Sequence, residues 1–193
     1  MTKTTSQGSG AAAPHSPNTI HALPKPSDEL KVRARLLVNA LRRNDPDALS
    51  TALAISAKRR WPEPQAWTLT HCMNLVSARA GFDHWDHARR VLGGEAQAGD
   101  DMGTLWYDDA CGAITNQWFA DYAEALAVFA ADASLFLLPY KRQFVLVDRY
   151  FIEALGLDAS APEWSEAGRD MVAGYRSAAW DALAHARLRA IRN

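Results

Sequence analysis

The sequence is short of the features that mark secreted, membrane-spanning or disulfide-stapled proteins. Its 193 residues include two cysteines, Cys72 and Cys111, which are too few for a disulfide framework and form no CxxC pair. No apolar run approaches the roughly 18 to 20 residues that cross a bilayer, and no apolar signal-peptide segment is present. We therefore expect a cytoplasmic protein in a reducing compartment, without membrane contact.

Catalytic signatures are missing as well. The chain contains no Walker loop and no GxSxG, HExxH or GxGxxG motif. The acidic pairs 100–101 and 108–109 make poor catalytic dyads, because adjacent strand residues point to opposite faces. Cys111 and His185 could form a nucleophile–base pair, but neither residue belongs to a recognised catalytic motif. The sequence favours a protein that is not an enzyme, and it implies no cofactor.

Charge is unevenly distributed along a chain whose net charge is −1. Residues 30–92 carry 11 Lys and Arg against 5 Asp and Glu, whereas residues 93–193 carry 8 against 15. Such a basic half is consistent with nucleic-acid binding. The alternative is that two halves of opposite charge pack on each other, and the scatter of the basic residues among helices favours this alternative.

Composition divides the chain into three segments. Residues 1–27 are rich in small residues, Ser, Thr, Gly and Pro, and the absence of an apolar period predicts a disordered tail. Residues 28–94 repeat apolar residues at three- and four-residue steps, which predicts a basic domain of four helices. Residues 103–193 mix strand-like and helical patterns and predict an acidic α+β domain.

Capping residues predict where the helices begin. Short polar side chains at N-caps accept hydrogen bonds from the first free backbone amides, and Pro46 fits the first helical position after Asp45. The expected N-caps are Ser27 or Asp28, Asp45, Thr68 or Thr70, Asp83 with Asp86, Asp121, and Asp148. In the helix after Asp121 we expect Leu126 and Phe129 to face inward.

Residues 134–148 contain the two densest apolar runs of the chain, separated by a short polar connection. Two β-prone runs in this arrangement predict an antiparallel hairpin, which we take as the centre of a small antiparallel sheet with flanking helices. Residues 105–107 and 113–119 are also strand-like. The expected fold class is α+β, with a four-helix segment preceding this sheet.

The hairpin tip carries the first candidate functional residues. Tyr140, Lys141 and Arg142 form a basic, aromatic point in an acidic half, and Trp118 lies on a neighbouring strand-like run. Aromatic residues and arginine are enriched in recognition surfaces. We predict that these four residues contact a macromolecular partner, with protein favoured over DNA. The alternative, which the seven tryptophans of the chain favour, is that the aromatic residues belong to the core and the loop charges are solvated.

A second candidate is a helix-turn-helix over residues 69–92, with Gly81 in the turn. Its second helix presents cations that read DNA, while others contact phosphates. The residues of this alternative are Arg79, Arg89, Arg90, Lys58, Arg59 and Arg60. Cations at helix C-termini also suit the helix dipole, which is an equally good structural explanation.

Histidines supply a third candidate. His84 and His87 are three residues apart and share a helix face, and His71 precedes them beside Cys72. Imidazole and thiolate are ligands for zinc, but the spacing matches no common zinc pattern. A hydrogen bond within the turn would equally explain His71.

One stretch resembles a known group of proteins. Leu69, Thr70 and His71, followed by Ala80, Gly81, Phe82 and Trp85, resemble a small helical segment of uncharacterised bacterial proteins that are often described as glyoxalase-related. A glyoxalase site would need repeated βαβββ modules with several metal ligands. The second half of this chain offers too few strands, and its only histidine is His185. The resemblance therefore implies no catalytic glyoxalase domain.

Three function classes remain open. The leading hypothesis is a non-enzymatic accessory, regulatory or immunity-type protein that binds a macromolecular partner, with protein favoured over DNA. A DNA-binding regulator is the alternative, and a small metal-dependent or hydrolytic enzyme comes third. The sequence identifies neither the partner nor the oligomeric state.

Overall fold

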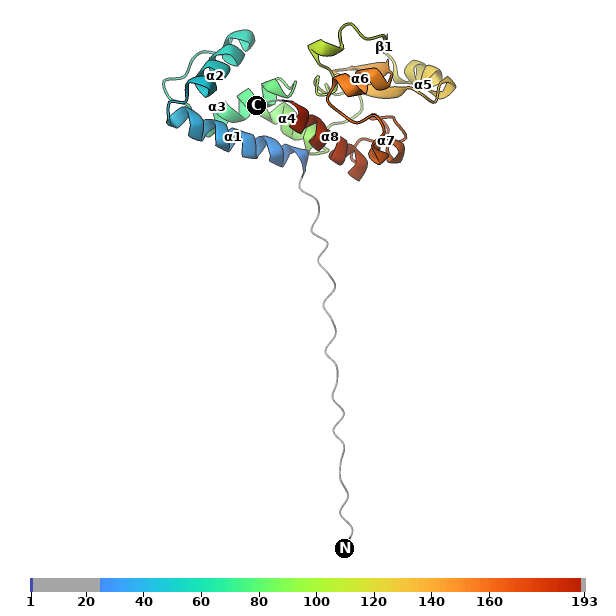
Figure 1. The fold of residues 1–193 in the computed structure, drawn as a ribbon, viewed down its shortest axis with the longest axis horizontal. Coiled ribbons are helices and arrows are strands. Elements are labelled where there is room, and N and C mark those ends of the chain that lie inside the picture. The colour runs from blue at the N-terminus through green and yellow to red at the C-terminus, as the bar shows by residue number, and fades with distance from the viewer. Residues whose placement is uncertain (2–24, 192–193) are drawn as a thin grey trace.

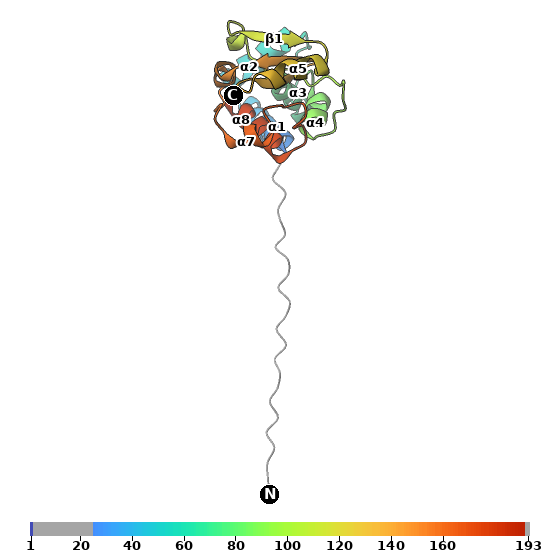
Figure 2. The ribbon, with the colours of Figure 1, turned by 90° about the vertical axis from the view of Figure 1, so that its right-hand side faces the viewer.

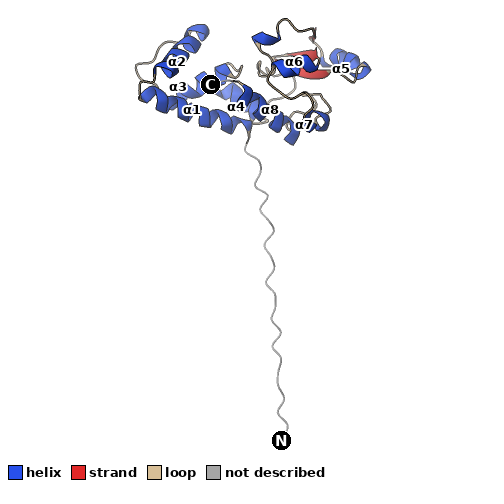
Figure 3. Ribbon diagram, in the orientation of Figure 1, coloured by secondary structure: helices blue, strands red, loops and turns tan. Residues whose placement is uncertain are grey.

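The computed structural model describes residue 1 and residues 25–191. Over these residues four helices precede a three-stranded antiparallel sheet with flanking helices, which confirms the predicted α+β class. The strands gather at one end of the molecule (Figure 3). The predicted disordered tail lies almost entirely outside the described residues. Within residues 25–191 no helix is long and apolar enough to span a membrane.

The N-terminal helices have the expected positions. They are α1 (Pro26–Arg42), α2 (Pro46–Arg59), α3 (Leu69–Arg79) and α4 (Trp85–Leu92). On α1, Leu30, Ala34 and Val38 recur at four-residue steps and are buried, as an amphipathic helix requires. On α2 the buried face is made of the small residues Ala52 and Ser56, and the larger Leu49 is exposed.

Local capping explains most helix starts. Asp45 accepts hydrogen bonds from the amides of residues 47 and 48, and Thr68 forms a reciprocal capping box with His71. Two expectations are wrong. Helix α1 begins at Pro26, with Lys25 as N-cap and no side-chain hydrogen bond. Helix α4 is capped by His84, whose ring accepts from the His87 amide, and not by the expected acidic pair.

The second half forms the sheet and its helices. Its elements are the 3₁₀ turn η1 (Asp109–Cys111), β1 (Asn116–Phe119), α5 (Tyr122–Ala131), β2 (Phe136–Tyr140), β3 (Gln143–Val147), α6 (Arg149–Ala154), α7 (Pro162–Glu166) and α8 (Ala178–Ala190). The predicted hairpin is confirmed as β2 and β3, with Tyr140 opposite Gln143. Strand β3 is central, in the order β1-β3-β2. Asp121 and Asp148 cap α5 and α6 as expected.

Both faces of the hairpin are buried. Leu137 and Leu146 pack with Ala125 of α5, while Leu138 and Val145 join the main core on the other face. Since alternate strand residues point to opposite faces, a sheet covered on both sides needs an unbroken apolar run. This requirement explains why the runs around the hairpin are the densest of the chain.

Two predictions for this half are wrong. Residues 105 and 106 lie in a turn and residue 107 in a loop, and no strand forms there. Trp106 is fully buried in the core, with its ring centroid 6.3 Å from that of Trp164 and 6.0 Å from that of Trp180. On α5, Leu126 is exposed, and the small Ala125 makes the buried contact with the sheet.

One hydrophobic cluster runs through both halves, from Leu30 of α1 to Leu188 of α8. Helix α8 contacts α1 on one side and α7 on the other. Figure 1 shows α8 between the helical end and the sheet end. Seen from the sheet end, β1 and α7 lie at opposite edges (Figure 2). The proposed division into two domains, 28–94 and 103–193, stays a prediction.

Arg187 of α8 is the most deeply buried cation that the structure describes, with 4% of the residue exposed. Its Nε donates to the Leu105 carbonyl at 2.9 Å, and its Nη1 donates to the Leu155 carbonyl at 2.7 Å. Its Nη2 donates to Asp108 at 3.1 Å. Its position near the end of α8 would suit the helix dipole, but its guanidinium instead binds two loops to α8.

Replacing Arg187 with Met should destabilise the fold by about 3 kcal/mol. The substitution removes a buried charge from its partner and leaves two carbonyl groups without a donor. Urea unfolding monitored by circular dichroism measures the change. The matched control is Arg189→Met on the exposed face of α8, which should stay within about 0.5 kcal/mol of the parent. Equal losses in the two variants would contradict the structural role given to Arg187.

Candidate binding cleft

A cleft of about 550 Å³ lies between the helical end and the sheet end. One wall is formed by the last turns of α2 and α3, and the other by the loop over residues 104–109 together with Tyr140. Arg187 and Ile191 also line it. The cleft therefore brings together residues that the sequence assigned to two different functions.

The helical wall is cationic. Arg59 is held in place, since it donates to the Phe82 carbonyl at 2.8 Å and pairs with Asp83 at 3.3 Å. The side chains of Lys58 and Arg79 make no hydrogen bond or ion pair with any described residue. Burial lowers the pKa of Arg79, and the neighbouring charge of Arg33 lowers it further. This wall thus carries two positive charges without a counter-charge.

The opposite wall is aromatic. The Tyr107 and Tyr140 rings meet edge to face at 5.3 Å. Trp118 extends the group, at 4.9 Å from Tyr140 and 5.8 Å from Tyr107, and it is 41% exposed. Its indole nitrogen donates to Asn116 at 2.6 Å, which fixes the ring on β1. Rigid aromatic side chains offer large contact area at low entropic cost.

Acidic residues lie beside the aromatic wall. Asp108 accepts from the Ala110 amide at 3.1 Å and from Arg187. These donors hold the pKa of Asp108 below its ordinary value, with the amide contributing most and burial opposing the shift. Asp109 lines the cleft and is exposed, without an ion pair among the described residues. Asp108 and Asp109 therefore differ in environment, since one is paired with Arg187 and the other faces solvent.

The other two hairpin-tip residues face elsewhere. Lys141 and Arg142 line a separate pocket of about 540 Å³, together with Tyr122, Tyr175 and Arg176. The backbone of Lys141 is left-handed, with φ of 52°, and its ammonium group lies 5.6 Å from the Tyr140 ring centroid. The four residues predicted to contact a partner protein are therefore divided between two surfaces.

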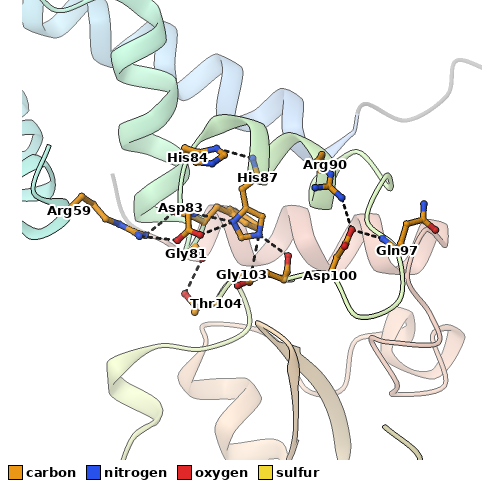
Figure 4. A network of polar contacts seen from close by, with 12 residues as sticks. Arg59, Gly81, Asp83, His84, His87, Arg90, Gln97, Asp100, Gly103 and Thr104 are labelled. Atoms are coloured by element: carbon orange, nitrogen blue, oxygen red, sulfur yellow. Dashed lines mark hydrogen bonds and ion pairs between the residues drawn. The ribbon is translucent and has the colours of Figure 1, made fainter. Parts of the chain in front are cut away.

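The helix-turn-helix residues are largely occupied by neighbouring carboxylates. Arg89 pairs with Glu95 at 2.7 Å, and Arg90 pairs with Asp100 at 2.6 Å. Figure 4 shows the second pair closing the loop that follows α4. Arg60 ends α2 in a left-handed conformation and lies outside the cleft lining. Only Lys58, Arg59 and Arg79 of the six predicted cations line the cleft.

The candidate metal ligands serve as local hydrogen-bonding groups. His71 accepts from the Thr68 amide at 3.3 Å. His87 Nδ1 accepts from the Asp83 amide at 3.2 Å, and its Nε2 lies 2.8 Å from the Asp101 carbonyl oxygen (Figure 4). His84 caps α4. Among the described residues no three His, Cys, Asp or Glu side chains gather as metal ligands would.

The α3–α4 turn is joined to the cleft wall through Gly81. Its φ of +92° suits glycine, and an added Cβ would lie 2.5 Å from Thr104 Oγ1. The Gly81 carbonyl accepts from the Thr104 amide at 2.8 Å (Figure 4). This contact holds the loop that carries Tyr107 against the helical half.

Comparisons of the chain with protein-family models, curated proteins and solved structures find no match. The resemblance to glyoxalase-related segments stays a prediction.

Removing the Asp108 carboxylate should make the free energy of unfolding depend less on pH in the acidic range. Because the folded pKa lies below the ordinary value of about 3.9, the ionised group stabilises the fold fully above that value. The contribution disappears as the pH falls through the folded pKa. In Asp108→Asn the loss of unfolding free energy between pH 5 and pH 2 should therefore be smaller than in the parent, by less than about 1 kcal/mol since the side chain is partly solvated.

The matched control for this measurement is Asp109→Asn, which removes an adjacent exposed carboxylate. Its pH profile should follow that of the parent in urea unfolding at each pH. Identical profiles for the Asp108 and Asp109 variants would show that the Arg187–Asp108 pair adds nothing to acid stability.

Both cysteines should be unreactive in the folded protein. Burial raises the pKa of the Cys72 thiol to about 11 and also raises the pKa of Cys111, whose sulfur contacts the Phe151 carbonyl at 4.0 Å. The thiolate is the reactive form. We expect no labelling by Ellman's reagent at pH 8 until guanidinium unfolds the chain. Fast native labelling that disappears in Cys111→Ala would instead support a nucleophilic Cys111.

Proposed function

We propose that this chain is a non-enzymatic binding protein that holds an extended, acidic segment of a partner protein in the cleft. The observation that carries the proposal is the position of two uncompensated cations, Lys58 and Arg79, across from an aromatic wall. This juxtaposition depends on the fold, since the two walls are far apart in sequence.

The cationic wall favours an anionic ligand. Arg79 is half-buried, so its charge is poorly solvated, and a carboxylate of the partner would compensate it. Lys58 is exposed at the rim, where charge mainly increases the association rate and its salt dependence. Acidic side chains spaced along one segment would meet both residues in turn.

The aromatic wall favours a ligand with apolar groups as well as charge. Tyr107, Tyr140 and Trp118 form one group of contacting rings, and energetically dominant interface residues are enriched in tyrosine and tryptophan. A side chain packed against this wall would anchor the segment, while Asp109 is positioned to accept backbone amides or a basic side chain of the partner.

Charge favours protein over nucleic acid as the partner. Nucleic-acid affinity grows with the number of phosphates that are neutralised, but Arg89 and Arg90 are already paired with carboxylates. Asp108 and Asp109 at the cleft would repel a ligand with a phosphate at every residue more strongly than a peptide with a few spaced carboxylates. Two cations without an ion pair among the described residues suit a short peptide better than a strand of nucleotides.

Selection from a random peptide display library tests the proposal. Selected peptides should contain Asp or Glu beside an aromatic or large apolar residue. A synthetic peptide of the consensus should bind at least tenfold more weakly to Trp118→Ala, Tyr140→Ala and Lys58→Glu, since Tyr140 and Lys58 line the cleft and Trp118 packs against the Tyr140 ring. Fluorescence anisotropy with the labelled peptide measures the affinity.

The matched controls lie on α6, away from the cleft. Tyr150→Ala removes a largely exposed aromatic ring, and Arg149→Glu reverses an exposed charge. Both should bind the peptide as the parent does. Selection without an acidic consensus, or equal affinity in cleft and control variants, would contradict the proposal. Tighter, steeply salt-dependent binding of a twelve-nucleotide dT strand would favour the nucleic-acid alternative instead.

A further inference from the structure

A second cavity, of about 260 Å³, lies among α1, α2 and α3. It borders the cleft, because Arg79 lines both spaces, but most of its lining is separate and apolar. Leu37 of α1, Ala48 of α2 and Val76 of α3 contribute one side chain from each helix. Small side chains such as Ala48 leave the space open, since α2 packs on α3 through its own small residues.

The mouth of this cavity is also apolar. Leu36 lines it and is 61% exposed, and no larger exposed fraction occurs for a described leucine. A ligand that enters would cover Leu36 and gain the free energy of burying apolar surface. The cavity therefore has the apolar character that small-molecule sites share.

Two arginines line the cavity, and only one of them forms an ion pair with a described residue. The Arg33 side chain is 10% exposed, pairs with Glu29 at 2.9 Å and donates to the Ile191 carbonyl at 3.1 Å. Arg79, half-buried beside it, has no such partner among the described residues. A partly desolvated guanidinium without an anion is unfavourable, so the site has a positive charge to be neutralised.

We propose that this cavity binds a small monocarboxylate with an apolar tail, with the carboxylate on Arg79 and the tail among Leu37, Ala48 and Val76. A guanidinium binds a carboxylate through two parallel hydrogen bonds. A cavity of about 150 Å³ holds benzene, so 260 Å³ accommodates a medium-length alkyl chain or a substituted ring. Asp47 at the lining disfavours ligands with several negative charges, such as a phosphate dianion.

This inference does not rest on the peptide-binding function proposed for the cleft, although the two ligands would compete for Arg79. Octanoate is a suitable probe, and 1-octanol is its uncharged counterpart, both below the concentration at which they aggregate. In isothermal titration calorimetry, octanoate should bind at least tenfold more tightly than 1-octanol to the parent chain. Arg79→Gln should remove this difference, because octanoate then loses its charged partner.

Thr51→Phe provides the second variant, since Thr51 lines this cavity and not the cleft. A ring there should fill the space and abolish binding of both probes while leaving peptide binding in the cleft unchanged. Arg35→Gln, on the exposed side of α1, is the matched control and should bind octanoate as the parent does.

Several results would overturn the inference. Equal affinity for octanoate and 1-octanol would remove the role of Arg79, and undiminished octanoate binding in Thr51→Phe would place the ligand elsewhere. Absence of octanoate binding to the parent at millimolar concentration would reject the site itself. Trp118→Ala is expected to bind octanoate normally, so failure of the cleft proposal and failure of this one are separable.

Discussion

The buried guanidinium of Arg187 is the interaction on which the aromatic wall of the cleft depends. Taking such a charge out of water is costly unless its donors find acceptors, and here the acceptors come from Leu105, Leu155 and Asp108. These residues belong to loops on either side of α8. The guanidinium therefore fixes the positions of these residues relative to one another. It also fixes the position of Tyr107, which lies between Leu105 and Asp108 in the sequence and forms part of the aromatic wall of the cleft.

The cationic wall has a different origin. Lys58 and Arg59 end α2, and Arg79 ends α3, where positive charge suits the helix dipole. The fold brings both helix ends to the same cleft. Cations that are favourable at helix C-termini for local reasons therefore also form one wall of the cleft. Arg59 serves the structure through its bonds to the α3–α4 turn, which leaves Lys58 and Arg79 for a ligand.

The uneven charge of the chain is only partly neutralised by packing. The acidic loop after α4 compensates Arg89 and Arg90, and Lys25 pairs with Asp181 of α8 at 2.8 Å. Lys25 lies outside the basic segment 30–92, and the other two pairs are local to the segment boundary, so the packing of two oppositely charged halves on each other stays a prediction. At the cleft, Lys58 and Arg79 form no ion pair with a described residue, and the function proposed for the chain rests on these two cations.

The sequence by itself determined the elements whose signals are local. Asp45, Thr68, Asp121 and Asp148 cap helices by hydrogen bonds to amides within three residues, and the hairpin follows from two adjacent apolar runs. Tertiary structure decided the rest. Trp106 becomes part of a turn because distant tryptophans surround it, and Arg187 is buried because acceptors far away in sequence converge on it. Only the fold could join Trp118 and Tyr140 to Lys58 and Arg79, since no local pattern encodes contacts across so many residues.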